Sequence, residues 1–309
     1  MCLIKMIDRN ECPLCGSQDN VIYIPFPEIP VIRCCKCGFT YSNKVLSGQD
    51  LVSYYENNFG SKRHMQGQLV NSRVNSWVIT RLLKIQDISN VLDIGTGYGF
   101  LLEELRKRFK LNATGVELSR QEAAYAKSML GLNVINSSLS ELGLDKGCYD
   151  LVTSFEVIEH VPDPVEFIRE MTQYVRPNGY LLIMTDNFDS RMAKFLGAGF
   201  PKWIPHTHIS HFSSTTLKKT IDIIKELILI KSMSYTPWEV LLRAAYYKLR
   251  GIKKTPSEAF DLKATLGSEM GGEYKLFLLR KLLNKAWAQL TLSEKMDGDL
   301  MYFLSRRIT

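Results

Sequence analysis

Short β-like runs alternate with helical segments between residues 90 and 185, and this alternation limits the fold more than any other feature of the sequence. The β-like runs are residues 90–94, 113–117, 134–135, 149–155 and 180–185. Strands that alternate with helices along a chain form a parallel sheet with helices packed on both faces. We therefore predict an α/β fold with a doubly wound, Rossmann-like sheet.

Two further β-like runs and two flanking regions complete the predicted architecture. Residues 227–232 and 300–305 add a sixth strand and a closing strand, which makes a seven-stranded, mostly parallel sheet. The predicted units are a zinc ribbon at 1–45, a helical connector or lid at 46–88, and an α/β domain at 89–309 with a helical insertion at 236–298.

The cysteines indicate a metal site rather than a disulfide framework. Six of the seven cysteines lie within the first 37 residues, and four of them form two Cys-x-x-Cys pairs, each followed by glycine. Two such turns present four thiolates to one ion, and a closed shell of four thiolates is typical of structural zinc. If the thiols were only reduced spectators, the two matched spacings would be a coincidence. The predicted zinc ligands are Cys12, Cys15, Cys34 and Cys37.

Composition excludes several classes of protein. Hydrophobic residues make up 45% of the 309 residues, which is enough for a packed core. No apolar run approaches the roughly 20 residues that cross a bilayer. The first residues, Met1 to Lys5, lack the layout of a signal peptide. We expect a cytoplasmic protein.

A glycine-rich turn follows the first predicted strand and indicates a nucleotide-like ligand. Asp93 precedes the turn at residues 95–99, and the chain then enters a helix at Phe100. A dinucleotide fingerprint requires a small residue at position 100, so hydride transfer is disfavoured. Glu117 ends the second strand, where a carboxylate accepts hydrogen bonds from ribose hydroxyls. Asp93 complements a cationic tail, and adenosine that carries such a tail is S-adenosylmethionine.

The ordered set of motifs resembles the class I S-adenosylmethionine-dependent methyltransferases, in a branch that begins with a zinc ribbon. The resemblance runs from Cys12 to about Tyr235. It is carried by Cys34 to Gly38 with Phe39-Thr40-Tyr41, Tyr54-Tyr55, Val91 to Gly99, Gly115-Val116-Glu117, Phe155 to Pro164, Pro177-Asn178-Gly179 and His208 to Ser213. The resemblance implies an enzyme that transfers a methyl group from S-adenosylmethionine.

The resemblance also implies which residues hold the cofactor. Asp93, Gly95 and Gly97 would bind the methionine part of the cofactor, and Glu117 would bind its ribose. Many relatives carry an aspartate after the third strand for the adenine amine, whereas this chain has Asn136-Ser137-Ser138. A serine hydroxyl or a backbone carbonyl would serve instead. The expected cofactor residues are Asp93, Gly95, Gly97, Gly99, Glu117, Ser138 and Phe155.

Methyl transfer to a hydroxyl or carbon acceptor also requires a base. His160 follows the fourth strand, and His206, His208 and His211 follow the fifth, so both loops should lie at the carboxyl edge of the sheet. His208 is the preferred base, because its setting resembles that of a histidine in zinc-containing nucleotide-sugar C-methyltransferases, although the neighbouring tyrosine of that group is absent. The expected catalytic residues are His208, His160 and Glu156.

The segment Glu156-Val157-Ile158-Glu159-His160 allows two interpretations. Some relatives that methylate catechols or RNA ends bind a divalent metal with a Glu-x-x-Glu-His cluster, and oxygen and imidazole ligands suit that role. Alternatively, Glu156 lines the acceptor pocket while Glu159 and His160 fix the loop. Both interpretations stay open from the sequence.

Most of the net charge lies near the carboxyl terminus. Residues 231–309 contain 14 Lys and Arg against 8 Asp and Glu, so they carry six of the seven net positive charges. The segments 238–250 and 274–290 are predicted to be helical, apolar and basic. Such segments can lie on an anionic membrane surface, which for a cytoplasmic protein is the inner face of the membrane. The favoured interpretation is that they cap the acceptor pocket or form a dimer face, with their lysines only solvated. Dense arginine and aromatic interleaving is missing, so a nucleic acid is disfavoured as partner.

We predict an S-adenosylmethionine-dependent O-methyltransferase of a sugar, a glycan intermediate or a comparable small metabolite. Carbon methylation of a sugar is less favoured, because the related enzymes continue into a second large domain. An RNA methyltransferase that uses the ribbon and the basic segments is one alternative. A scaffold that keeps the cofactor fold without catalysis is another.

Overall fold

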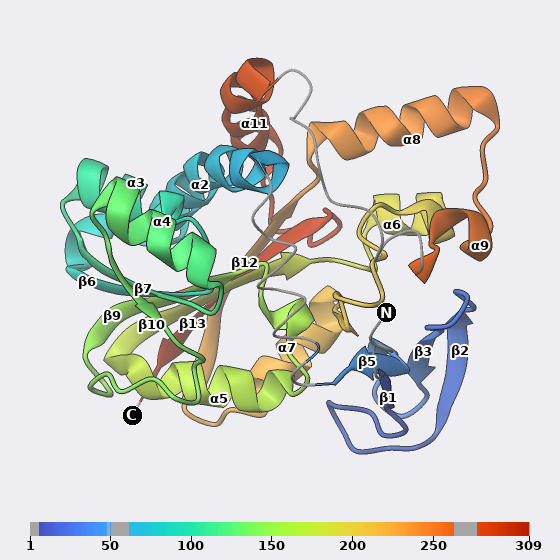
Figure 1. Cartoon of the computed structure of the whole chain (residues 1–309), viewed down its shortest axis with the longest axis horizontal. Coiled ribbons are helices and arrows are strands. Elements are labelled where there is room, and N and C mark those ends of the chain that lie inside the picture. The colour runs from blue at the N-terminus through green and yellow to red at the C-terminus, as the bar shows by residue number, and fades with distance from the viewer. Residues whose placement is uncertain (1–5, 48–49, 51–61, 263–276, 309) are drawn as a thin grey trace.

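A seven-stranded sheet forms the centre of the structure (Figure 1). The computed structural model describes residues 6–47, 50, 62–262 and 277–308. The strand order is β12-β13-β10-β9-β6-β7-β8, and of these strands β13 alone runs antiparallel to its neighbours. The strands are β6 (Asn90–Ile94), β7 (Asn112–Glu117), β8 (Asn133–Asn136), β9 (Tyr149–Phe155), β10 (Val175–Asp186), β12 (Leu227–Tyr235) and β13 (Leu300–Arg307). The predicted fold class is confirmed.

The strand order fixes where a ligand can bind. The chain runs outward from β6 to β8 and then returns to add β9 on the other side of β6. The loops that follow β6 and β9 therefore leave the sheet in opposite directions, and the crevice at such a switch point is the usual ligand site of open α/β sheets.

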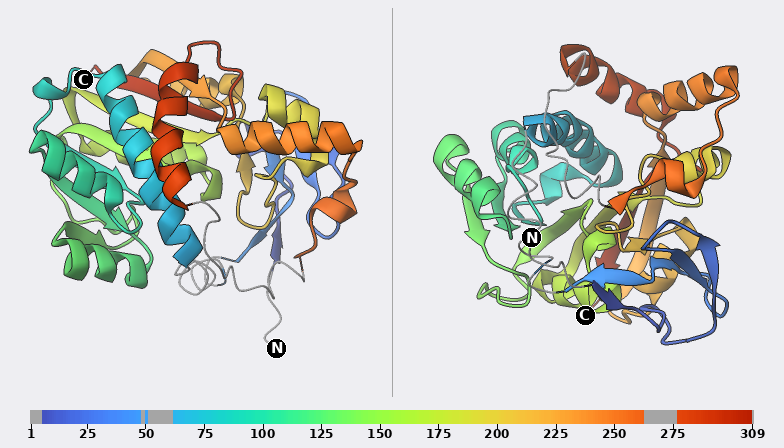
Figure 2. Two further views of the ribbon diagram at one scale, coloured as in Figure 1. Left: turned by 90° about the horizontal axis from the view of Figure 1, so that it is seen from above. Right: turned by 45° about the vertical axis from the view of Figure 1, so that its right-hand side comes forward.

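Helices cover both faces of the sheet. One face is covered by α2 (Lys62–Leu82), α3 (Phe100–Phe109), α4 (Arg120–Leu130) and α11 (Phe277–Thr291), and α11 lies against α2 (Figure 2). The other face is covered by α5 (Pro164–Tyr174) and α7 (Ser214–Asp222). Local signals start these helices: the Ser119 hydroxyl caps α4, and Asp163 caps α5 with proline at its first position. The remaining helical elements are η1 (Ile85–Asp87), η2 (Ile158–His160), α6 (Arg191–Leu196), η3 (Gly197–Gly199), α8 (Trp238–Arg250) and α9 (Pro256–Ala259).

Two predicted segments extend beyond what the structure describes, and one differs. The helix expected from residue 51 to 84 is described from Lys62, and the segment expected from 274 is described from Phe277. The fifth strand, expected at 180–185, begins earlier, because β10 includes residues 177–179 and shifts register along β9 between Val175 and Tyr180. None of the described helices combines the length and apolarity that crossing a bilayer requires.

The cysteine-rich segment is joined to the α/β domain by a shared sheet. Its strands are β1 (Met6–Asp8), β2 (Asn20–Ile24), β3 (Val31–Cys34), β4 (Thr40–Ser42) and β5 (Lys44–Leu46). The outer strand of the order β11-β4-β3-β2 is β11 (Ser210–His211), which comes from the histidine-bearing loop of the α/β domain. Phe39 packs edge-on against Phe212, with ring centroids 5.1 Å apart. The ribbon and this loop therefore share one core.

Replacement of Gly99 by alanine should destabilise the fold more than replacement of Gly131. Both glycines have left-handed backbone angles, but a Cβ at Gly99 would lie 2.6 Å from the Leu132 side chain, whereas a Cβ at Gly131 meets nothing within 4 Å. We expect Gly99→Ala to lower the free energy of unfolding by about 2–4 kcal/mol and Gly131→Ala by about 1 kcal/mol. Thermal and urea unfolding of the two variants measure the difference. Equal losses would contradict the packing described here.

Candidate active site

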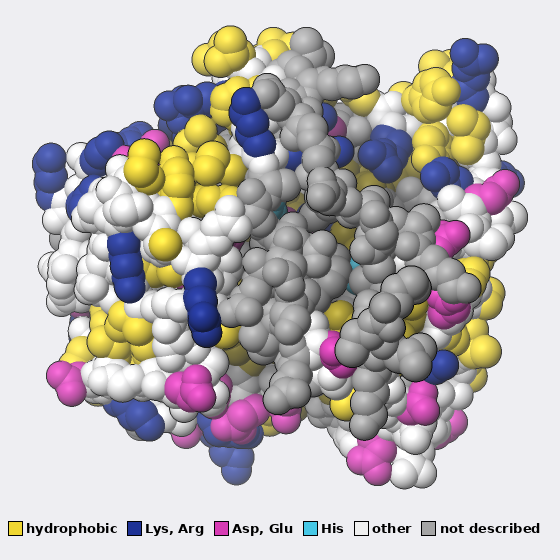
Figure 3. Space-filling model, in the orientation of Figure 1, with side chains coloured by type: hydrophobic (Ala, Val, Ile, Leu, Met, Phe, Trp, Pro, Cys, Tyr) yellow, Lys and Arg dark blue, Asp and Glu magenta, His cyan; other side chains and the backbone are white. Residues whose placement is uncertain are grey.

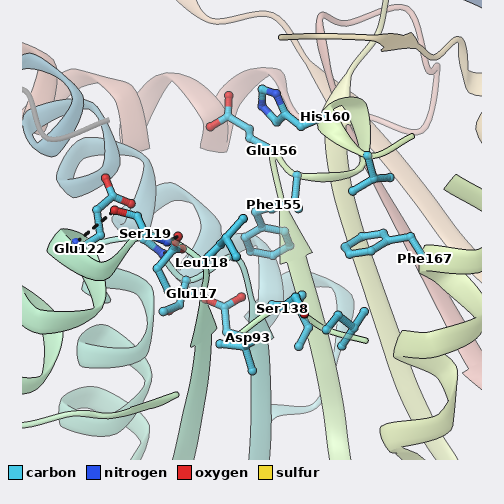
Figure 4. A pocket seen from close by; sticks show the side chains of 18 of the residues that line it. Asp93, Glu117, Leu118, Ser119, Glu122, Ser138, Phe155, Glu156, His160 and Phe167 are labelled. Carbon is cyan, nitrogen blue, oxygen red and sulfur yellow. Dashed lines mark hydrogen bonds between the residues drawn. The ribbon is translucent and has the colours of Figure 1, made fainter. Parts of the chain in front are cut away.

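A cavity of about 630 Å³ lies at the carboxyl ends of β6, β7 and β9 (Figure 4). Helix α2 contributes one of its walls. A volume of this size is within the range of small-molecule sites. Eight of the predicted site residues line the cavity: Asp93, Gly95, Gly97, Glu117, Ser138, Phe155, Glu156 and His160. Gly99 and His208 are not among its lining residues.

The glycine turn after β6 packs closely against two side chains, Gln68 and Val157. Gly95 and Gly97 have φ angles of 75° and 56°. A Cβ at Gly97 would lie 2.3 Å from Gln68 Oε1, and a Cβ at Gly95 would lie 2.4 Å from a Val157 methyl. The Gln68 oxygen also accepts a hydrogen bond from the Tyr98 amide at 2.9 Å. The turn therefore requires glycine for both its backbone angles and its close neighbours. Gly99 is required for a different reason, because it packs against α4.

Glu117 at the end of β7 holds the glycine turn in place. Its two carboxylate oxygens accept hydrogen bonds from the amides of Gly97 and Ser119, each at 2.8 Å. A carboxylate oxygen accepts more than one hydrogen bond, so the same group is suited to receive ribose hydroxyls. Burial, followed by the charge of Glu122, raises the pKa of Glu117 to about 7.

Asp93 lies at the base of the cavity. Its Oδ1 accepts a hydrogen bond of 2.6 Å from the Thr153 hydroxyl on the neighbouring strand. Burial raises the pKa of Asp93 to about 6. A cation placed against this carboxylate would favour its ionised form and lower the pKa again. The Asp93 carboxylate thus fits the cationic tail of S-adenosylmethionine, and the Glu117 carboxylate fits its ribose.

The opposite end of the cavity carries a partly buried ion-pair network, in which only Asp186 is fully buried. The Lys202 ammonium lies 3.0 Å from Glu156 Oε1 and 3.1 Å from Asp186 Oδ1. Asn71 on α2 donates to the other oxygen of Glu156 at 3.2 Å. The Lys202 charge lowers the pKa of Glu156, whereas burial raises the pKa of Asp186 to about 7. Glu156 adopts a positive φ of 56°. This uncommon backbone angle turns its side chain toward the cavity (Figure 4).

The His160 ring lines this end of the cavity, and the His208 ring lies behind it. His160 Nδ1 is 2.9 Å from the Thr207 carbonyl oxygen, which can only accept, so Nδ1 carries the proton and Nε2 is the basic nitrogen. The His208 ring is 4.7 Å from the His160 ring, and its Nδ1 is 3.6 Å from Asp186 Oδ2. Burial lowers the pKa of His160 to about 4 and that of His208 well below its usual range. Both rings are therefore neutral at pH 7 and able to accept a proton.

The other two histidines of the loop belong to the packing. His206 is fully buried and stacks on Phe260 with centroids 5.6 Å apart. His211 lies in β11, 4.8 Å from the Trp203 ring and 3.4 Å from the Ser42 hydroxyl. The shared sheet thus holds the end of the loop that carries His208.

The residues predicted for a second divalent metal do not converge on one point. Glu156 is engaged by Lys202 and Asn71, and an ammonium group beside it opposes a second cation. Glu159 accepts a hydrogen bond from the Thr185 hydroxyl at 2.7 Å, and burial raises its pKa to about 8. Glu159, His160 and His208 do place ligand atoms within 4.8 Å of one another, without Glu156. Glu156, Glu159 and His160 together therefore do not form a metal site.

The four cysteines predicted as zinc ligands do converge. Their sulfur atoms all lie within 4.8 Å of one another, with 3.5 Å between Cys12 and Cys37 and between Cys15 and Cys34. Tetrahedral zinc bound to four thiolates requires sulfur atoms about 3.8 Å apart. None of the described cysteines forms a disulfide. The residues present therefore fit a zinc ion.

Residues 63–222 match the family model described as "Methyltransferase domain", which covers slightly more than half of the chain. The chain belongs to this methyltransferase family. It is a class I S-adenosylmethionine-dependent methyltransferase, as the seven-stranded sheet and the resemblance of its motifs led us to expect. The prediction that the protein is an enzyme is confirmed at this level.

The methyltransferase is similar to proteins named "Ubiquinone biosynthesis O-methyltransferase". It is 29% identical to the one from Vibrio campbellii over 144 residues, which are 43% of this chain and 61% of that protein. It is 33% identical to the one from Cronobacter sakazakii over 107 residues, 33% of this chain and 44% of that protein. The chain thus spans less than two thirds of the length of these relatives.

A solved structure from Thermotoga maritima, titled as an S-adenosylmethionine-dependent methyltransferase and possible histamine N-methyltransferase, has the same fold. The TM-score is 0.51 and the identity 16%, over 78% of this chain and 91% of that one. Such a likeness shows the architecture alone.

The sequence missed four residues of the site. Gln68 and Asn71 lie on α2 at a spacing of three, which places them on one helix face, but their neighbours gave no reason to select them. Lys202 and Asp186 follow from no motif, because they meet Glu156 only after the chain has folded. An acid at the end of the fifth strand, next to the sheet edge that binds ligands, is the one signal that could have identified Asp186.

The affinity of the methyltransferase for S-adenosylmethionine should rise as the pH increases from about 5.5 to 7.5. The pKa values of Asp93 and Glu117 are raised to about 6 and about 7, so both groups bind protons at the lower pH. Because the cationic tail and the ribose hydroxyls favour ionised carboxylates, binding releases protons, and acid opposes binding. Titration calorimetry in two buffers of different ionisation enthalpy measures both effects. Asp93→Asn should release fewer protons, and pH-independent binding by the wild type would contradict the assignment.

Proposed function

We propose that this methyltransferase transfers the methyl group to a hydroxyl of a small, unphosphorylated molecule such as a sugar, a glycan intermediate or a comparable metabolite. The observation that carries the proposal is the charge of the cavity. Seven carboxyl side chains line it, and its described lining residues include no lysine or arginine, while Lys202 next to the wall is already paired with Glu156 and Asp186. Phosphate groups would be repelled by such a wall. This charge disfavours RNA and nucleotide sugars as acceptors, which were the alternatives considered from the sequence.

The names of the relatives support oxygen as the methylated atom. Both of the relatives described above are named as O-methyltransferases. Oxygen acceptors also suit a site with a base, because a hydroxyl must lose its proton during methyl transfer. S-adenosylmethionine, when bound, supplies an electrophilic methyl group and leaves as a neutral thioether.

His160 is the residue placed to receive the proton. It lines the cavity beside Glu156, and the Thr207 carbonyl fixes the tautomer that has its basic nitrogen at Nε2. His208 lies behind it, with its ring 4.7 Å from the His160 ring and its Nδ1 3.6 Å from Asp186 Oδ2, and so helps to position His160. Glu156, held by Lys202 and Asn71, is placed to accept a hydrogen bond from an acceptor hydroxyl. We thus assign the direct role to His160 and a supporting role to His208.

An acceptor screen tests the proposed function. Metabolite extracts are incubated with the enzyme and methyl-labelled S-adenosylmethionine, and mass spectrometry identifies labelled products. Labelled methyl ethers of unphosphorylated compounds are the expected result. Label that enters only RNA, or only phosphorylated sugars, would contradict the proposal.

Replacement of His160 by alanine or by asparagine should lower kcat about 100-fold or more. Asparagine retains a donor that can reach the Thr207 carbonyl, so it would rescue a purely structural role but not proton transfer. Affinity for S-adenosylmethionine should stay within about twofold in both variants, since His160 lies at the acceptor end. Steady-state kinetics and calorimetry give the two values. Normal turnover of His160→Asn would remove His160 as the base.

We further propose that zinc bound by the four cysteines supports the active-site loop. Hydrogen bonds connect the ribbon directly to the loop. Ser42 in β4 donates to the Pro205 carbonyl at 2.7 Å, and Arg9 donates to the Ile209 carbonyl at 2.8 Å. Lys219 on α7 donates to the Cys37 carbonyl at 2.8 Å. Closed four-thiolate zinc sites contribute directly to folding stability.

Removal of zinc should loosen residues 206–211 before it unfolds the central sheet. Hydrogen exchange of the protein, with and without a strong chelator, measures the protection of this segment and of β6. We expect faster exchange of the loop amides and unchanged exchange of β6 in the chelated protein. The same result is expected for Cys37→Ser, while Cys148→Ser is the matched control because Cys148 is exposed and outside the ribbon. Elemental analysis without zinc, or uniform exchange, would contradict the proposal.

A further inference from the structure

Helix α8 presents an apolar stripe to solvent. Leu242, Tyr246 and Leu249 are separated by four and three residues, so they lie on one face of the helix. They are 59%, 53% and 86% exposed. The opposite side of α8 is the packed one, where Val240 and Ala244 are buried against the segment that includes α6. A leucine exposed to this extent on a regular helix marks a surface that contacts another apolar phase.

Helix α11 presents a second apolar stripe at the same edge of the molecule. Leu278 and Leu282, four residues apart, are 73% and 70% exposed, and Leu290 is 81% exposed. The side chains of Trp238 and Asn284 are hydrogen bonded, and Arg280 pairs with Glu239 at 3.6 Å, so the two helices are linked. Figures 1 and 2 show α8 and α11 on the same side of the molecule. We name the exposed leucine and tyrosine residues of α8 and α11 the outer face.

Basic side chains accompany the outer face. Arg243, Lys248 and Arg250 are exposed on α8, and Lys253 and Lys254 follow it. Within its described residues 277–291, α11 has Arg280, Lys281 and Lys285 and no acid. The single acid of α8, Glu239, is paired with Arg280. Figure 3 shows hydrophobic and basic side chains side by side over α8.

We propose that the outer face docks the enzyme on the surface of an anionic phospholipid membrane. Leucines that project from a helix insert between acyl chains at the interface, while lysine and arginine next to them contact lipid phosphates. This combination of exposed leucines and an excess of cations matches both halves of such a surface. The proposal does not depend on the identity of the methyl acceptor.

Two other occupants fit the outer face less well. In a twofold dimer the same surface meets itself, so the cations of one copy would face those of the other. RNA would match the cations, but it would leave the exposed leucines of both helices in water, and the described residues of the outer face offer one aromatic ring for stacking, Tyr246. A membrane surface satisfies the leucines and the cations together.

Vesicle co-sedimentation of the whole protein tests the proposal. The probes are vesicles of phosphatidylcholine alone and vesicles with about 30% phosphatidylglycerol, each at low and at physiological salt. We expect binding to the anionic vesicles only, weakened by salt. Leu249→Ser with Leu282→Ser should weaken binding about tenfold or more, and Lys253→Glu with Lys254→Glu should weaken it to a similar extent. Met129→Ser is the matched control, since Met129 is 67% exposed on α4 outside the outer face, and it should bind as the wild type does.

Three results would overturn the proposal. The first is no binding to the anionic vesicles. The second is binding that the leucine variant leaves unchanged. The third is a stable dimer, seen by light scattering at micromolar concentration, that the leucine variant converts to monomer. Circular dichroism of each variant confirms that it is folded, and exposed positions make this the expected outcome.

Discussion

One buried carboxylate organises the cofactor end of this methyltransferase. Glu117 receives the amides of Gly97 and Ser119, so a single side chain at the end of β7 ties the glycine turn of β6 to the start of α4. The amides of Gly95 and Thr96 donate to the Val116 carbonyl at 2.8 and 3.1 Å, and Glu117 adds the contact that holds Gly97. The carboxylate also lies where ribose hydroxyls are expected, so we expect the group that shapes the turn to bind the ligand as well.

The ribbon and the active-site loop form one structural unit. The chain returns after about 170 residues to place β11 beside β4, and the loop between β10 and β11 carries Lys202 and His208. Lys202 reaches back to Glu156 and Asp186, and His208 reaches His160. The acceptor end of the site is thus assembled from three segments, and the ribbon sheet fixes the last of them. A small cysteine-rich unit therefore bears on the geometry of a site that it does not line.

The sequence predicted the sheet, the glycine turn and the ribbon ligands, because each depends on a local pattern. Asp93, Glu117 and the cysteine pairs stand at positions that the period of the chain defines. Lys202 and Asp186 were not predicted, since their role arises from an ion pair between residues 16 positions apart, with α6 and η3 between them. The sequence also could not show which of the two histidines lies nearer the cavity. The setting of His208 favoured it as the base, but in the structure His160 lines the cavity wall. Which ring is nearer depends on how the loop packs against the ribbon.

The central claim is that the carboxylate-supported turn holds S-adenosylmethionine. Titration calorimetry of the wild type, Glu117→Ala and the surface control Glu104→Ala with this cofactor tests it most directly. We predict one binding site in the wild type, unchanged affinity in Glu104→Ala, and a loss of about tenfold or more in Glu117→Ala, because the ribose hydroxyls lose their acceptors. Equal affinity in all three proteins would contradict the account.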